Sequence, residues 1–204
     1  MKKAINLLII VLIFNLSFIN AFGNNSIPKS DSGKMALVII DVQNFYFSEG
    51  NLPLVNPEEA SLKAKELLEK FRKEKLPVIH IRHNSSSQAE IHINVAPIDG
   101  EKVISKDFAN GFKETDLLNY LNENKITKLI LCGMQTHMCV EATTRAASDF
   151  GFDCIVVEDA CATRDLKYKD KIIKAEDVHF STLSSLKGSY AKIIDTKTFI
   201  IQFK

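Results

Sequence analysis

One cysteine, Cys139, stands where an apolar strand gives way to a helix, and this position suits a nucleophile. Residues 129–132 form a short apolar run with the length and composition of an interior parallel strand. Beyond Gly133 the spacing of the buried-type residues changes from that of a strand to that of a helix, which puts Cys139 in the first turn of a helix. Unpaired N–H groups and the helix dipole there favour a thiolate. The same N–H groups can hold the oxyanion of an acyl-transfer intermediate.

A thiol nucleophile needs a base, and later a proton source for the leaving group. His137 is close in sequence, but residues two apart on a helix do not face each other, so a carboxylate from another strand end is the better candidate. Asp41 directly follows the apolar run 35–40, and ligands of parallel sheets bind at the carboxyl ends of strands. Lys106 supplies a cation that would keep Asp41 ionised and favour the thiolate of Cys139.

Strands and helices alternate along the chain around these three residues. The patterns predict strands at 35–40, 77–82, 103–105, 129–132, 154–157 and 191–194. They predict helices from Pro57 to about Lys75, after a cap at Thr115, from the Cys139 turn to about Phe150, and from Asp170 or Glu176 to Lys187. We therefore expect an α/β fold, a Rossmann-like three-layer α/β/α sandwich around a parallel sheet of about six strands.

The N-terminal residues have the pattern of an export signal. Two lysines, an apolar stretch and small residues before a cleavage point predict a signal peptide at 1–23, with an uncleaved N-terminal anchor as the alternative. We expect a flexible linker at 24–33, a single domain at 34–204, and export to a bacterial periplasm or secretion. Cleavage leaves 24 basic and 25 acidic residues without a basic cluster, which disfavours nucleic-acid and membrane partners for the mature chain.

Four cysteines in an oxidising compartment suggest disulfides. However, Cys132 and Cys154 lie in apolar strand runs, and Cys161 follows one. We therefore expect reduced thiols, of which Cys139 alone is reactive.

The chain resembles the isochorismatase-like cysteine hydrolases over about residues 35–196. The resemblance rests on five motifs in order: LVIIDVQN at 37–44, PVIHIRH at 77–83, Lys106 with Phe112 following, GMQTHMCV at 133–140 and EDACA at 158–162. It implies Asp41 as general base, Lys106 as charged orienter and Cys139 as nucleophile. It also implies a cis peptide bond before Gln135, with the N–H groups of Gln135 and Cys139 as the oxyanion hole.

The resemblance points to a hydrolase of small amides or ureido compounds that acts through a thioester, without a cofactor or metal and as a dimer or tetramer. Metal-dependent nicotinamidases carry an Asp-x-His pair soon after the second strand, but this chain has no Asp there before His92. True isochorismatases lack the cysteine. The alternatives are a non-catalytic exported binding or scaffold protein, and an isochorismatase or nicotinamidase type of activity. A papain-like protease would need His179 as a distant base, which no flanking motif supports.

Five further residues are candidates for contact with a small-molecule substrate. Gln43 either bonds the substrate or holds its own loop, and Phe47 either lines the pocket or packs. His83 ends the second strand, and His137 suits a pocket wall better than a base. Phe112 follows Lys106 within the motif of the resemblance.

Overall fold

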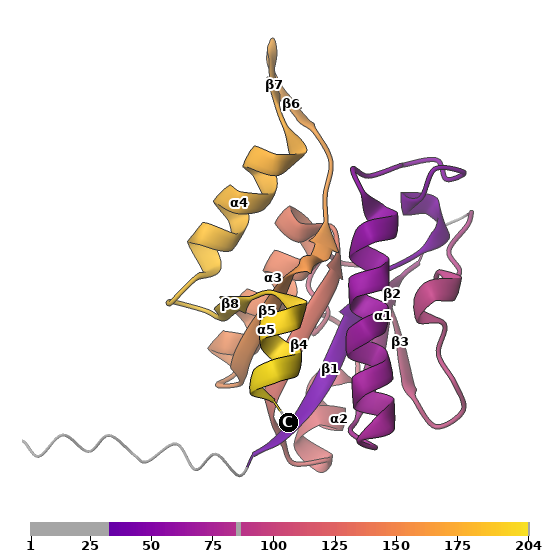
Figure 1. The fold of residues 1–204 in the computed structure, drawn as a ribbon, viewed down its shortest axis with the longest axis vertical. Helices are drawn as coiled ribbons and strands as arrows, with labels where there is room; N and C mark the ends of the chain where they lie inside the picture. Colours follow the sequence, from indigo (N-terminus) through magenta and orange to yellow (C-terminus); the bar gives the residue numbers. More distant parts are fainter. Residues whose placement is uncertain (1–32, 85–86, 204) are drawn as a thin grey trace, which may run out of the picture. The chain divides into compact units, whose positions relative to one another are not determined.

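The computed structural model describes residues 33–84 and 87–203, and Figure 1 shows strands and helices alternating through them. The predicted signal peptide and nearly all of the linker lie outside the described residues. The strands are β1 (Lys34–Ile40), β2 (Val78–His83), β3 (Lys102–Lys106), β4 (Ile126–Met134), β5 (Asp153–Ala162), β6 (Leu166–Tyr168), β7 (Lys171–Ile173) and β8 (Lys192–Ile194). The α-helices are α1 (Pro57–Lys73), α2 (Leu117–Glu123), α3 (Glu141–Asp149), α4 (Ala175–Leu186) and α5 (Thr196–Gln202).

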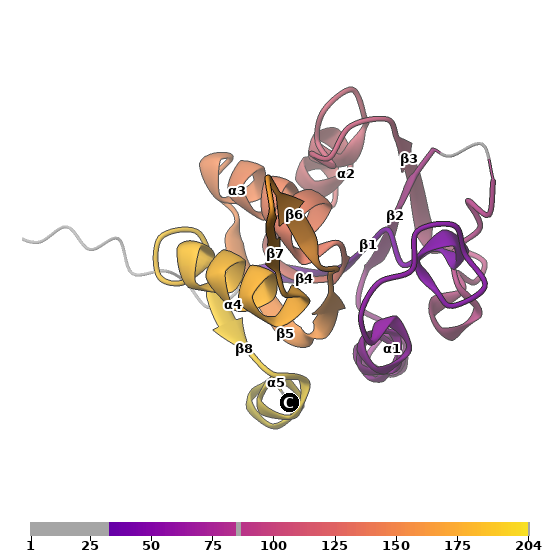
Figure 2. The same ribbon diagram turned by 90° about the horizontal axis from the view of Figure 1, so that it is seen from above.

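Six of the strands form one parallel sheet in the order β3-β2-β1-β4-β5-β8. Figure 2 shows α1 and α5 on one face of this sheet and α2, α3 and α4 on the other. The predicted three-layer fold is thus confirmed. Central strands covered on both faces need apolar side chains throughout, which explains the unbroken runs that end β1 and fill β4. Within the described part of the chain, no helix is long and apolar enough to cross a membrane.

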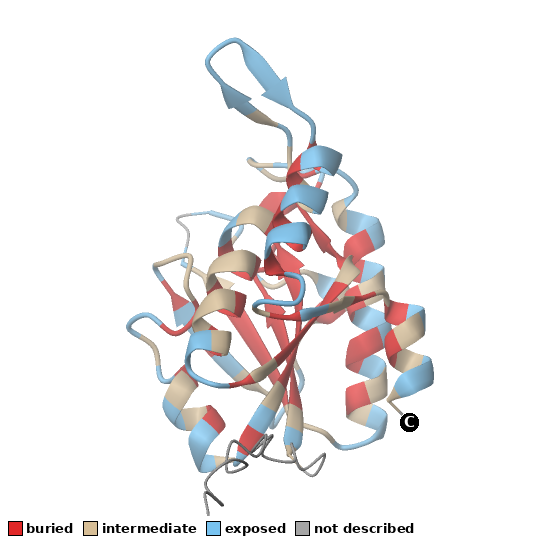
Figure 3. Cartoon of the chain, turned by 90° about the vertical axis from the view of Figure 1, so that its left-hand side faces the viewer, coloured by how far each residue is buried: buried red, intermediate tan, exposed pale blue. Residues whose placement is uncertain are grey.

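The structure adds elements that the sequence patterns did not predict. The antiparallel hairpin of β6 and β7 stands away from the sheet, and Figure 3 shows it largely in the colour of exposed residues. Because the hairpin occupies Asp170, α4 begins at Ala175, close to the later of the two predicted starts. Helix α5 was missed because its sequence TKTFIIQ is rich in β-branched residues, which favour strands.

Two predicted helix caps differ from the structure. Asn56 precedes α1 but lies in the left-handed region at φ +51°, and its side chain makes no capping hydrogen bond. Asp116 takes the N-cap position of α2, although the Thr115 hydroxyl, which donates to the carbonyl of Gly111, still accepts from the N–H group of Leu117 at 3.4 Å. Both helices still begin within two residues of the predicted starts, because the apolar periodicity sets where they pack.

Strand register brings the chemistry-bearing residues to one level of the sheet. Ile40 pairs with Ile81 on one side and with Gly133 on the other, so Asp41 emerges directly beyond both neighbours. His83 pairs with Lys106 across β2 and β3. The carboxyl ends of four adjacent strands therefore meet where the sequence predicted a site.

Gly133 is essential to this arrangement because β1 and β4 approach very closely there. Its φ is +126°, and a Cβ atom at this position would lie 2.0 Å from the carbonyl oxygen of Ile40. Any other residue would combine an unfavourable backbone conformation with a backbone clash.

We expect Gly133→Ala to lower the free energy of unfolding by at least about 2 kcal/mol, from strain and overpacking together. Gly151→Ala is the matched control: its φ is +89°, but nothing lies within 4 Å of the added Cβ. That variant should lose only about 1 kcal/mol, from backbone strain alone. Urea unfolding followed by circular dichroism measures both, and equal losses would contradict the proposed clash with Ile40.

Candidate active site

A buried ion pair lies at the centre of the site. The Nζ atom of Lys106 donates to Oδ2 of Asp41 at 2.6 Å, and the two side chains are fully buried. The Nδ1 atom of His83 lies 3.5 Å from the same Nζ atom. A buried charge is stable only beside an opposite charge, so each of these two residues requires the other.

Burial makes Asp41 a stronger base than an ordinary carboxylate. Desolvation raises its pKa above the usual range, while the positive charge and hydrogen bond of Lys106 oppose that rise. A carboxylate with a raised pKa, held beside a cation, is suited to accept a proton and return it.

Cys139 lies in a turn of π-helix, Thr136–Val140, which connects the end of β4 to α3. Its side chain interacts with both Asp41 and Lys106, so the three predicted catalytic residues lie together. The predicted thiolate, however, is wrong for the resting site. Burial and then the negative charge of Asp41 raise the pKa of the Cys139 thiol to about 12, and Lys106 only partly offsets them. At neutral pH the Cys139 side chain is therefore a protonated thiol beside the carboxylate of Asp41.

The turn before Cys139 contains the cis peptide bond that the resemblance implied, between Met134 and Gln135. The carbonyl oxygen of Gln135 accepts hydrogen bonds from the N–H groups of Met138 and Val140, which flank Cys139. The Gln135 side chain is buried, and its Nε2 atom donates to the hydroxyl of Tyr46 at 3.3 Å. Hydrogen bonds of both the backbone and the side chain of Gln135 therefore hold this turn in place.

Gln43 takes the loop-holding role of its two predicted roles. Its Nε2 atom donates to the carbonyls of His83 and Ala89, at 2.9 and 2.6 Å. Its Oε1 atom accepts from the N–H group of His83 at 2.7 Å. Since the amide uses its donors and its acceptor on backbone groups, the expected contact between Gln43 and substrate is corrected: Gln43 positions His83 beside Lys106.

The two predicted aromatic contacts serve packing instead. Phe47 is buried, and its ring stacks on that of His92 with the centroids 3.6 Å apart. Phe112 packs against Phe150 and Phe152, which lie between the end of α3 and the start of β5. That contact is at the amino ends of the strands, opposite the triad, so the prediction that Phe112 binds substrate is wrong. Because Phe112 lies six positions after Lys106, the chain between them is long enough to carry Phe112 to the amino ends of the strands.

The remaining histidines have partners of their own. The Nδ1 atom of His137 lies 2.5 Å from the hydroxyl oxygen of Thr163, and its predicted place on a pocket wall stays a prediction. His80 contacts Glu101 at 2.9 Å, and His179 contacts Thr136 at 2.9 Å. Among residues 33–84 and 87–203, no group of three or more His, Cys, Asp or Glu side chains is placed to hold a metal ion.

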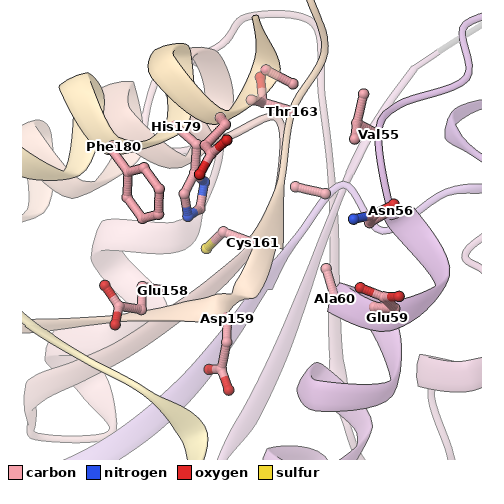
Figure 4. A pocket seen from close by; sticks show the side chains of 13 residues that line it. Val55, Asn56, Glu59, Ala60, Glu158, Asp159, Cys161, Thr163, His179 and Phe180 are labelled. Carbon is pink, nitrogen blue, oxygen red and sulfur yellow. The ribbon is translucent and has the colours of Figure 1, made fainter.

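A cavity of about 540 Å³ lies beside the end of β5 (Figure 4). It is separate from the triad, because neither Asp41, Lys106 nor Cys139 lines it. Two of its lining residues, His179 and Thr163, nevertheless contact Thr136 and His137 in the turn that carries Cys139. The residues predicted to act as nucleophile and base therefore meet at the buried ion pair and not in this cavity.

Sequence reasoning missed the residues that continue the site beyond β5. Thr163 and Arg164 directly follow that strand, and the charge of Arg164 affects the pKa of both His137 and Tyr46. Their position could have identified them, because they follow the end of a strand as Asp41 does. It went unused because the predicted strand stopped at Val157, five residues before β5 ends.

We expect Asp41→Asn to lower the pKa of the Cys139 thiol from about 12, because it removes a negative charge and leaves Lys106 unopposed. Thiolate absorbance in the ultraviolet, titrated against pH, measures this shift. Cys161 is an internal reference, since burial raises its pKa to about 12 without any effect of Asp41. A Cys139 titration that is unchanged or moves upward would contradict this electrostatic account.

Comparison with known proteins agrees with this geometry. Residues 35–197 match the model of the isochorismatase domain. The isochorismatase family protein YddQ of Bacillus subtilis is 42% identical, over 81% of this chain and 98% of that protein. The secreted isochorismatase effector Isc1 of Verticillium dahliae is 36% identical, over 74% of this chain and 87% of its own.

Two further comparisons bear on structure and on chemistry. A solved structure from Oleispira antarctica, classed among isochorismatase hydrolases, is 40% identical with a TM-score of 0.80, covering 83% of this chain and 97% of that one. A streptothricin hydrolase of Streptomyces noursei is 31% identical, over 64% of this chain and 50% of that protein. From the domain match and the shared fold, the chain belongs to the isochorismatase family.

Proposed function

We propose that the protein is a cysteine-dependent hydrolase that cleaves the C–N bond of a small amide or ureido compound through a thioester. The observation that carries this proposal is the contact among Cys139, Asp41 and Lys106, which places a thiol, a base and a cation in one buried site. A similar protein is named for the hydrolysis of streptothricin, which supports hydrolytic chemistry in the family.

The reaction begins when the sulfur of Cys139 attacks the substrate carbonyl carbon and its proton passes to Asp41. Because the resting thiol has a pKa of about 12, transfer to a carboxylate of raised pKa accompanies the attack. The carbonyl oxygen becomes an oxyanion, which the N–H groups of Gln135 and Cys139 stabilise. Lys106 keeps its charge and balances Asp41 when that residue is ionised.

Collapse of this intermediate breaks the C–N bond. Asp41 returns its proton to the departing nitrogen, so ammonia or an amine leaves and a thioester remains on Cys139. Water then attacks the thioester and gives a proton to Asp41. The C–S bond breaks, the acid is released, and Asp41 re-protonates the sulfur, which restores the resting site.

Export is part of this proposal. The basic, apolar and small-residue pattern at 1–23 supports it, and a 36% identical relative is named as a secreted effector. The substrate of an exported hydrolase would be met outside the cytoplasm, in the periplasm or the surrounding medium.

We expect the mature protein to release ammonia from members of a panel of small primary amides, ureido acids and nicotinamide. Cys139→Ala should lower turnover by at least about a thousandfold, because no other group replaces the nucleophile. Cys161→Ala is the matched control: it removes another buried thiol of raised pKa that is not influenced by Asp41 or Lys106. An enzymatic ammonia assay measures turnover, and circular dichroism checks the fold.

A second readout tests the intermediate directly. Rapid quenching followed by mass spectrometry should detect an acyl group on the peptide that contains Cys139. Full activity in Cys139→Ala would exclude this mechanism. Tight binding of panel members without turnover by the wild-type protein would instead favour the non-catalytic binding protein.

A further inference from the structure

The segment that joins β3 to α2 begins directly after Lys106. Strand β3 is the outermost strand on its side of the described sheet, with β2 as its neighbour. The Lys106 ammonium group nevertheless reaches across β2 to the carboxylate of Asp41. The contacts that hold the segment after Lys106 therefore help to set where this cation lies.

The Thr143 side chain holds this segment against α3. Its hydroxyl oxygen accepts from the N–H group of Gly111 at 2.9 Å in a buried hydrogen bond, and it lies 3.5 Å from the carbonyl oxygen of Ala109, to which it donates. Thr143 itself is fully buried. Among the described residues, these are the only hydrogen bonds that join 108–112 to another strand or helix.

Gly111 lies tightly between two elements of the site. A Cβ atom there would lie 2.9 Å from Cδ1 of Ile81 and 3.1 Å from the hydroxyl oxygen of Thr143. Ile81 is on β2, two residues before His83, and Thr143 is on α3. The loop backbone therefore packs directly against both elements, without room for a side chain between them.

Thr143 is also close to the predicted nucleophile along the chain. It follows Cys139 by four residues, where the π-helical turn Thr136–Val140 continues into α3. Residues four apart in a helix are neighbours on one face. The hydrogen bond to Gly111 therefore ties the helix of the predicted nucleophile to the segment that follows the predicted cation.

We propose that Thr143 is a positioning residue, whose hydroxyl holds the segment after Lys106 against the Cys139 helix and so sets the distance between the ammonium group and the sulfur. This inference deepens the proposed function, and it rests on Cys139 as the nucleophile and Lys106 as its cation. Lys106 lowers the pKa of the Cys139 thiol, whereas burial and Asp41 raise it. Because the attraction between opposite charges weakens with distance, a cation that moves away stabilises the thiolate less.

Alkylation of Cys139 by iodoacetamide tests this role without a substrate. The sulfur bonds to the methylene carbon, the C–I bond breaks, iodide leaves and the thiol proton passes to the buffer. Mass spectrometry of the Cys139 peptide gives the rate constant. Between about pH 7.5 and 9.5, well below the pKa of this thiol, the rate is proportional to the small fraction of thiolate.

We expect Thr143→Val, which keeps the shape of the side chain but removes the hydroxyl, to slow this alkylation by roughly threefold to tenfold, the effect of a rise of about half to one pKa unit. Thr143→Ser keeps the hydroxyl and should react within about twofold of the wild-type rate. Thr144→Val is the matched control. Thr144 is equally buried, but its hydroxyl donates to the carbonyl of Val140 in its own helical segment, at 2.7 Å, and not to the loop.

The direction of the change separates positioning from a role in stability alone. Loosened packing around the buried sulfur would expose it more often and speed its alkylation. A rate that is unchanged or faster in Thr143→Val overturns the proposal, and so does an equal fall in Thr144→Val. Circular dichroism checks the fold of each variant.

Gly111→Val tests the same contact from the loop side, and it decides the matter if Thr143→Val does not fold. The added side chain overlaps Ile81 and Thr143 and displaces the loop, while Thr143 keeps its hydroxyl. This variant should also react more slowly than the wild-type protein, and an unchanged or faster rate overturns the proposal. The ammonia assay is a separate measurement: absence of turnover would count against the hydrolase, and the alkylation rates would still decide the role of Thr143.

Discussion

The ion pair between Lys106 and Asp41 is the interaction on which the site depends. Both side chains are fully buried, and the strands that carry them are separated by β2, so the sheet must keep its register for the charges to meet. Removing either partner would leave an uncompensated charge in the core, at a cost of several kcal/mol. Asp41 and Lys106 therefore come together only when the sheet folds in the correct register.

Together with burial, this pair affects the protonation of Cys139. A cysteine at the start of a helix is commonly expected to be a thiolate, yet here the buried carboxylate raises its pKa to about 12. In the mechanism that we propose, the sulfur holds the proton at rest, and Asp41 accepts it during attack on the carbonyl carbon. A protonated thiol reacts with oxidants more slowly than a thiolate does, so the raised pKa also protects Cys139 from oxidation.

Much of this could be predicted from sequence because strand ends in a parallel sheet are ordered by topology. The apolar runs before Asp41 and Gly133 were long enough to identify both strands, and the shared edge followed. Phe112 could not be placed, because the side of the molecule that a loop residue reaches depends on where the following helix packs. The role of Gln43 depends on which polar neighbours are satisfied, and no pattern in one sequence records that.

The strand order places polar residues on both sides of β4, the strand that precedes Cys139. Asp41 and Lys106 come from β1 and β3 on one side of β4, whereas Thr163 and Arg164 follow β5 on the other side. The hairpin after Arg164 pairs only with itself and lies clear of the sheet. The pairing that aligns Asp41 with Lys106 does not include the hairpin, so we expect substitutions there to leave that alignment unchanged. Variation in the hairpin can thus change the surface beyond β5 while the buried ion pair stays the same.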